Sequence, residues 1–457
     1  MKNIILVSPQ SKLRDIKRDL ISKILDAGYH IVLLIVSMLE DKRDYENIQG
    51  IDKVMTLVEI EEIESLDLID YDVIQQCRVA QFNYEIFSTR FQNDHAMIKF
   101  SYYTALNFWL RVFDENRIDF VINTQMIHGR LDDVILWSVA NMKRVKMFFF
   151  EEIGYNNSHC INYNGKLCPV YCESENTLDD ILQPEKDKRF VQSTSVQKIE
   201  KGKFYQLLYT VGGNLLEDFT RRLIHWNWKP RSIHRQKSKA FWSDKFLGYI
   251  KLKRIEHHLN RLSNRFNKAE NYIFYALHFE PEATIEVRVI LENQLAIIKM
   301  LSDVLPYGWK LYVKEHPSQF NLNNDGGYGY LISVPRFKSR EFYDKIAGFK
   351  NVRIVSTNTQ SDELINNSKA VASIVGTVFF EAIQKLKPIL AFSDLNPVIF
   401  SKDVFSIHSY DECQKAVDKI AQGFKPKYDD INSVLKHYTL TKYELGKNIV
   451  KLLQAEC

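Results

Sequence analysis

The feature that most constrains the fold of this 457-residue chain is an alternation that occurs twice: apolar runs of strand length are separated by amphipathic stretches of helix length. In the first alternation, helices are predicted over 11–27 and 131–143, with a long helical region to about residue 117, and strands over 3–8, 30–36, 52–57, 119–124 and 145–150. Strands that alternate with helices indicate parallel βαβ units. We therefore expect a Rossmann-like domain over residues 1–175.

The second alternation predicts a further Rossmann-like domain over residues 271–425. Its strands are expected over 271–279, 310–316, 351–356, 370–375 and 388–392, and its helices over 285–304, 338–348, 361–367 and 377–386. Residues 176–270 lack a strand pattern and predict a largely helical, basic connecting segment, while 426–457 predict a C-terminal helix, amphipathic over 428–455. By analogy with other two-domain folds, that helix is expected to cross back to the first domain. The expected class is α/β with two Rossmann-like domains.

Length and composition support a packed protein of two domains. The N-terminal MKNIILVSPQ is interrupted by polar residues too early for a signal peptide and predicts a first strand. No apolar run approaches the roughly 20 residues that span a bilayer. We therefore expect a cytoplasmic protein, with peripheral attachment to the inner face of the cytoplasmic membrane as the one form of membrane contact.

Metal and nucleic-acid binding are not expected. His159, Cys160, Cys168 and Cys172 cluster in the sequence, but their spacing matches no common zinc pattern, so they are interpreted as ordinary side chains, with reduced thiols. No nucleic-acid-binding motif accompanies the basic residues.

Residues 221–268 concentrate basic side chains among aromatic ones, including Trp226, Trp228 and Trp242. This mixture suits an anionic membrane surface or a negatively charged glycan acceptor. The alternative is an ordinary solvated helical face.

The first candidate site residues follow the predicted strands of the second half, because ligands of parallel sheets bind beyond the carboxyl ends of the strands. Lys314 and His316 end one strand, and a histidine there can donate a hydrogen bond to a phosphate. His278 and Glu282 end another. The alternatives are a core histidine and an acidic residue that merely opens the next helix.

A third strand of the same half contains Ser373 and is followed by Gly376, Thr377 and Glu381. Glycine lets the backbone approach a ligand, and the amides and hydroxyl at a helix start bind anions. Glu381 is placed to accept hydrogen bonds from ribose hydroxyls. In the alternative interpretation Thr377 is an ordinary N-cap and Glu381 faces solvent.

In the first half, candidates for a general base follow two strands. Glu151 and Glu152 directly follow the strand over 145–150, and His128 lies shortly after the strand over 119–124. Carboxylate and imidazole groups can take a proton from an acceptor hydroxyl. A salt-bridged or capping carboxylate is the alternative for either acidic residue.

These residues carry a resemblance to the capsule polysaccharide biosynthesis glycosyltransferases, which include bacterial 3-deoxy-manno-octulosonic acid (Kdo) transferases and are distantly similar to bacterial polysialyltransferases. The resemblance covers most of both halves. It rests on three elements and on the segment 278–284: the acidic pair before Gly154, the pair His316–Pro317, and Ser373 with Gly376, Thr377 and Glu381. The chain departs from the pattern by Ile153 between the acidic pair and Gly154, and by Gly376–Thr377 where paired hydroxyls are common.

The resemblance implies a metal-independent glycosyltransferase of the GT-B type. In such enzymes the His-Pro and Ser/Thr elements bind cytidine monophosphate, which would assign that role to His316, Ser373 and Thr377, and an acidic residue of the first motif is the base. The expected donor is CMP-Kdo or a related CMP-activated acid, and the expected acceptor is a growing surface polysaccharide or a lipid-linked glycan. No cofactor is expected, because the nucleotide sugar is a substrate.

Three other functions remain open. A nucleotide-sugar 2-epimerase shares the two-half architecture, although the basic aromatic segment argues against a small soluble substrate. A teichoic-acid-type glycerophosphotransferase also uses a His-Pro element, but its usual Asp-Tyr-Ser-Ser segment is missing. A non-catalytic polysaccharide-assembly protein could have the same fold, since architecture does not determine activity.

Overall fold

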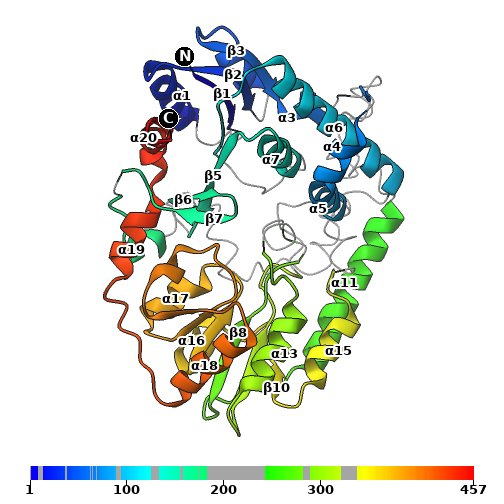
Figure 1. Cartoon of the computed structure of the whole chain (residues 1–457). Helices are drawn as coiled ribbons and strands as arrows, with labels where there is room; N and C mark the ends of the chain where they lie inside the picture. Colours follow the sequence, from blue (N-terminus) through cyan, green and yellow to red (C-terminus); the bar gives the residue numbers. More distant parts are fainter. Residues whose placement is uncertain are drawn as a thin grey trace.

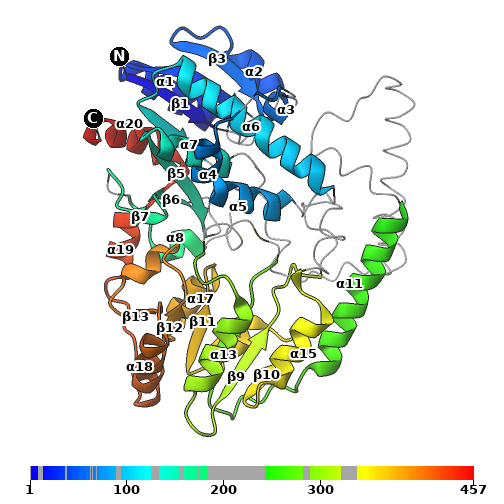
Figure 2. The same ribbon diagram turned by 45° about the vertical axis from the view of Figure 1, so that its right-hand side comes forward.

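The computed structural model of the chain is divided into two α/β units that lie one above the other in Figure 1. It describes residues 2–8, 14–36, 39–61, 63, 65–67, 69–88, 94–124, 133–154, 158–172, 174–182, 242–280, 282, 289–320 and 337–456. The C-terminal helices run from the lower unit up one side of the upper unit, so both chain ends lie in the upper unit (Figures 1 and 2).

The N-terminal unit is built on a sheet in the order β14-β6-β5-β4-β1-β2-β3, with β7 paired to β6. The strands from β5 to β3 are mutually parallel, as the alternation predicts. Ile4, Ile5, Leu6 and Val7 of β1 are completely buried, because helices cover both faces. Its strands and helices are β1 (Lys2–Val7), α1 (Arg14–Asp26), β2 (Tyr29–Val36), α2 (Leu39–Tyr45), β3 (Ile51–Thr56), α3 (Leu57–Glu61), α4 (Tyr71–Gln76), α5 (Arg78–Ser88), α6 (His95–Glu115), β4 (Phe120–Asn123), α7 (Asp133–Met142), β5 (Lys146–Ile153), β6 (Ser158–Tyr163), β7 (Lys166–Cys168) and α8 (Leu178–Leu182).

The C-terminal unit is built on a parallel six-stranded sheet in the order β10-β9-β8-β11-β12-β13. Helix α11 lies on the outside of this unit and packs against α15 (Figure 2). The elements are α11 (Trp242–Leu262), β8 (Tyr272–Ala276), α13 (Gln294–Val304), β9 (Lys310–Lys314), α15 (Arg340–Gly348), β10 (Val352–Ile354), α16 (Ser361–Asn367), β11 (Ala370–Ser373), α17 (Val378–Gln384), β12 (Ile389–Ala391), η4 (Pro397–Phe400), β13 (Val404–Ser406) and α18 (Tyr410–Ala421).

The predicted C-terminal helix is present, but it does not cover 428–455 as a single helix. The stretch forms α19 (Ile431–Tyr438), the short strand β14 (Thr439–Leu440), η5 (Lys442–Glu444) and α20 (Leu445–Ala455). Thr439 and Leu440 leave the helix because they pair with Cys160 and His159 of β6. Helix α20 packs on α1, which confirms that the chain returns to the first unit.

Two other elements differ from the sequence prediction. The helix expected over 285–304 begins at Gln294, where the Asn293 side chain accepts a hydrogen bond from the amide of Ala296, and residues 289–293 are not helical. After β5 the chain turns back as the antiparallel strands β6 and β7, which the sequence pattern did not predict.

An apolar seam joins the two units. Ile181 of α8 is completely buried in a cluster with Phe379, Phe380 and Ile383 of α17, and Ile153 at the end of β5 packs against the same cluster. No helix among the described residues combines the length and apolar character that crossing a bilayer requires.

Candidate functional site

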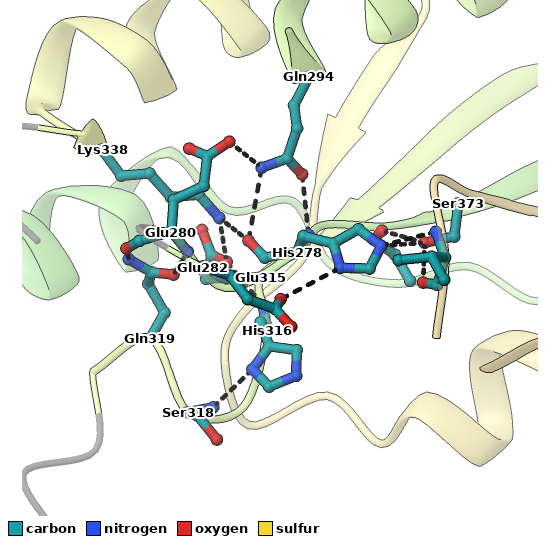
Figure 3. A network of polar contacts seen from close by, with 12 residues as sticks. His278, Glu280, Glu282, Gln294, Glu315, His316, Ser318, Gln319, Lys338 and Ser373 are labelled. Carbon is teal, nitrogen blue, oxygen red and sulfur yellow. Dashed lines mark hydrogen bonds and ion pairs between the residues drawn. The ribbon is translucent and has the colours of Figure 1, made fainter. Parts of the chain in front are cut away.

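A dense network of polar contacts lies at the carboxyl ends of β8, β9 and β11, which are neighbours in the C-terminal sheet (Figure 3). His278 follows β8, His316 follows β9, and Ser373 ends β11. Parallel strands place all three residues at one edge of the sheet. The structure therefore brings together the three elements predicted for the second half.

The His278 ring is held by two hydrogen-bond contacts at Nε2 and faces a carboxylate at Nδ1. Its Nε2 accepts a hydrogen bond from the Val375 amide at 3.0 Å and lies 3.1 Å from the Ser373 hydroxyl. Because a backbone amide can only donate, the neutral ring carries its proton on Nδ1, which faces a Glu282 carboxylate oxygen at 3.7 Å.

Ser373, His278 and Glu282 follow one another like a hydrolase triad, but the geometry excludes that role. The lone pair of Nε2 that would take the serine proton is occupied by the Val375 amide. Ser373 is 1% exposed, and its hydroxyl donates its proton to the Ala276 carbonyl at 3.0 Å. The structure thus makes Ser373 a support for His278.

Gly376 occupies a position that only glycine adopts without strain, with φ of +125°. A Cβ there would lie 3.6 Å from His278 Cε1, so the turn follows the imidazole ring closely. Thr377 is the N-cap residue of α17 but makes no side-chain capping bond. Glu381 lies partly exposed in the first turn of α17.

His316 is held in the opposite tautomer to His278. Its Nδ1 accepts a hydrogen bond from the Ser318 amide at 3.1 Å, so the neutral ring carries its proton on Nε2. Burial lowers the pKa of His316 to about 4, and the neighbouring Glu282 only partly offsets that effect. At neutral pH the residue is an uncharged hydrogen-bond donor, and its Nε2 has no partner among the described residues.

Lys314 presents a buried ammonium beside this donor. The residue is 5% exposed, and its side chain makes no hydrogen bond or ion pair with the part of the chain that the structure describes. Burial lowers the pKa of Lys314, while the charges of Glu315 and Glu381 act in the opposite direction. A buried ammonium without a partner of opposite charge favours the binding of an anion.

Below the strand ends lies an ion pair that the sequence pattern did not predict. Lys338 and Glu315 are both completely buried at the side chain and joined at 2.8 Å. Glu315 also accepts hydrogen bonds from the Tyr343 hydroxyl and the His316 amide, each at 2.6 Å. Lys338 also donates to the His278 carbonyl, so one ammonium connects the ends of β8 and β9. No spacing rule links residues so far apart in sequence.

Two glutamines complete the network. The Gln319 side chain donates to the Glu280 carbonyl at 2.7 Å and accepts from its amide at 3.0 Å. Gln294 accepts from the His278 amide at 2.8 Å and donates to the Glu280 carboxylate at 2.6 Å. Burial raises the pKa of Glu280, against the lowering effect of Lys338.

In the N-terminal unit, Glu151 and Glu152 extend beyond the carboxyl edge of the parallel sheet. β4 ends opposite Phe149, whereas β5 continues to Ile153 and pairs with β6 alone. Successive strand residues point to opposite faces, and Glu151 is 9% exposed while Glu152 is exposed. The predicted alternative base, His128, lies outside the described residues.

Among the described residues, no group of three or more His, Cys, Asp or Glu side chains is arranged to hold a metal ion. Of the four residues that cluster in the sequence, His159 and Cys160 lie in β6 and pair with β14. The Cys172 amide donates to the Asn448 side chain at 2.9 Å.

Comparisons with known proteins give structural matches but no sequence matches. No family model matches the chain, and no curated protein matches it. Its structure is similar to the Methanocaldococcus jannaschii UDP-GlcNAc 2-epimerase in complex with UDP-GlcNAc and UDP, at 12% identity over 100% of both chains and a TM-score of 0.29. The Thermosulfurimonas dismutans β-Kdo 2,4-transferase KpsC matches 70% of this chain and 87% of its own, at 12% identity and a TM-score of 0.27.

A glycosyl transferase of family 9 from Veillonella parvula matches 99% of this chain and 97% of its own, at 9% identity and a TM-score of 0.22.

Proposed function

We propose that the chain is a metal-independent glycosyltransferase that binds a nucleotide sugar at the carboxyl edge of its C-terminal sheet. The observation that carries the proposal is the pair of Lys314 and His316: a buried ammonium without a described partner lies in sequence beside a neutral N–H donor. A charge and a hydrogen bond of this kind suit a phosphate group. The charge of Glu381 partly offsets the lowering of the Lys314 pKa by burial, so Glu381 lies near Lys314. It is the candidate partner of ribose hydroxyls.

The N-terminal unit supplies the candidate base. Inverting transfer requires a group that takes the proton of the acceptor hydroxyl while the nucleotide phosphate departs. Glu151 and Glu152 are the candidates, and because they lie on opposite faces of β5, only one of them is expected to face the acceptor. The Glu151→Gln and Glu152→Gln variants should therefore differ, with one losing at least about 100-fold in kcat.

The donor is proposed to be CMP-Kdo or a related CMP-activated acid, and the acceptor a surface polysaccharide or lipid-linked glycan. A panel of CMP, UDP, GDP and ADP in a thermal-shift assay tests the donor class. Selective stabilisation by CMP supports this assignment, and selective stabilisation by UDP replaces it with a uridine nucleotide. Stabilisation by none of the four contradicts the proposed donor site and favours a non-catalytic assembly protein.

A nucleotide-sugar 2-epimerase is the second candidate, and Glu280 is the observation that favours it. Burial raises the pKa of this carboxyl beside the strand-end network, which gives the C-terminal unit a candidate acid–base group of its own. Incubation with UDP-GlcNAc in deuterated water separates the two activities. Deuterium at C2 of the sugar supports epimerisation, whereas transfer to an acceptor leaves C2 unlabelled.

The basic helix α11 is proposed to recruit the protein to an anionic membrane or acceptor. Lys251, Arg254 and Arg261 are exposed, while Leu252, Ile255 and Leu259 are buried. Exposed charges bind anionic lipid in a salt-dependent manner. Phosphatidylglycerol vesicles should therefore co-sediment with the protein at low salt and release it at high salt, and absence of binding at low salt contradicts this role.

A further inference from the structure

The position of Gly154 links the acidic strand end to the C-terminal unit. Gly154 follows β5 with φ of +71°, in the left-handed region that glycine tolerates. A Cβ built on it would lie 2.3 Å from Ile181 Cγ2 and 2.7 Å from the Ile181 carbonyl oxygen. The second contact is with backbone, so a side chain at this position must displace α8 or the end of β5.

Ile181 in turn contacts the helix that follows the candidate phosphate site. It is completely buried in one cluster with Phe379, Phe380 and Ile383, and α8 packs directly against α17. Helix α17 begins two residues after Gly376, whose preceding residue Val375 donates to the His278 ring. Ile153 packs against the same cluster from the side of β5.

The acidic pair and the His278 turn are therefore connected by a short path of packed residues: β5 end, Gly154, Ile181, α17. Such an interior is close-packed and transmits a displacement instead of absorbing it. We propose that Gly154 and Ile181 are positioning residues, which set the location of Glu151 and Glu152 relative to the nucleotide site across the seam between the units. This inference rests on the proposed function, because it assigns the glutamates a substrate held by the other unit.

The substitution Gly154→Ala tests the proposal, with Gly165→Ala as the matched control. Gly165 has a φ of +77° in the same unit, and a Cβ there would meet no atom within 4 Å. The two variants share the backbone penalty, and only Gly154→Ala adds the collision with Ile181. With CMP-Kdo as donor, we expect Gly154→Ala to lower kcat at least tenfold while donor KM and the Kd of CMP stay within twofold of wild type. Gly165→Ala should retain wild-type kcat.

Substitutions of Ile181 provide a second test of the same contact. Adding Ile181→Ala to Gly154→Ala removes the Cγ2 contact and should restore part of kcat. If Gly154→Ala does not fold, Ile181→Val in the wild-type background, which loosens the packing of Ile181 in its cluster with α17, should lower kcat by less than tenfold without a change in KM. Equal effects of the two glycine variants, or parallel losses of kcat and CMP binding, overturn the proposal.

Hydrogen exchange measured by mass spectrometry separates this inference from the proposed function. Gly154→Ala should increase amide exchange in Val378–Gln384 of α17, in the other unit, whereas Gly165→Ala should leave it unchanged. This result is expected even if the wild type neither binds CMP nor transfers a sugar. Unchanged exchange in α17 overturns the coupling, whereas absent CMP binding and transfer in wild type overturn the proposed function alone.

Discussion

The two units hold their polar strand ends in different ways. At the carboxyl edge of the C-terminal sheet, His278, His316 and Glu315 are fixed by other side chains and by backbone amides. At the end of β5, the backbone of Glu151 and Glu152 is fixed by strand pairing with Cys160 and His159 and by the packing of Gly154 on Ile181. Under the proposed function, the first arrangement preorganises a binding surface within one unit, whereas the proposed coupling makes the position of the carboxylates depend on contact between the units.

The largest expected effect tests the side-chain network of the C-terminal unit. Lys338→Met leaves the Glu315 carboxylate buried without its ion-pair partner, which typically costs about 3–5 kcal/mol. Urea denaturation should show a loss of that size. Lys385→Met is the matched control, because Lys385 pairs with the exposed Asp362 and should cost less than about 1 kcal/mol. A loss below about 1 kcal/mol for Lys338→Met means that the network does not hold the strand ends.

A smaller loss of stability is expected from a substitution at Gly376, where the backbone turn packs close to the His278 ring. Gly376→Ala forces alanine to a φ of +125°, at a cost of about 1–3 kcal/mol, and should shift the Val375 amide on His278. We therefore expect lower thermal stability together with roughly tenfold weaker CMP binding, equivalent to about 1.4 kcal/mol.

Gly423→Ala is the control for that variant, since Gly423 has a φ of +95° and open space around its Cβ. It should lower stability and leave CMP binding unchanged. Equal CMP affinities in the two variants contradict the role of the Gly376 turn.

The smallest effect concerns the return of the chain to the N-terminal unit. Lys146 donates to Glu456 after α20 and, with Tyr171, lowers the pKa of that carboxyl. Because the folded-state pKa lies below the unfolded one, this stabilisation is present above about pH 4.5 and is lost as the pH falls through the folded value. Glu456→Gln should therefore cost about 0.5–1 kcal/mol at pH 7 and less at pH 3. A cost that is equal at both pH values contradicts this assignment.

Elements with uniform burial were the ones that the sequence predicted well. β1, β2 and β9 fall within about two residues of their predicted bounds, because strands covered on both faces are continuously apolar. β6 was missed since SHCINY mixes polar and apolar residues whose burial depends on pairing with β5 and β14. The break at Thr439 likewise depends on a distant partner strand, which a local helical pattern cannot indicate.

The candidate site was predictable only in part, and for the same physical reason. His278, His316 and Ser373 follow apolar runs, so the rule that parallel strands end at one edge brings them together. Lys338, Gln294 and Gln319 act through contacts across long sequence separations and follow no local pattern. The resemblance assigns Ser373 to the nucleotide, which stays a prediction; in the structure its hydroxyl contacts His278 and Ala276.

The most direct test of the donor site is calorimetric titration of CMP into wild type, His316→Ala and the exposed control His408→Ala at pH 6, 7 and 8. We expect His316→Ala to weaken binding roughly 10–100-fold, the worth of a charge-assisted hydrogen bond, and His408→Ala to bind as wild type. Because the pKa of His316 is about 4, the ratio of the His316→Ala to wild-type Kd should stay within about twofold across this range. Equal CMP affinities for wild type and His316→Ala contradict the account, and a ratio that rises steeply towards pH 6 contradicts the neutral donor.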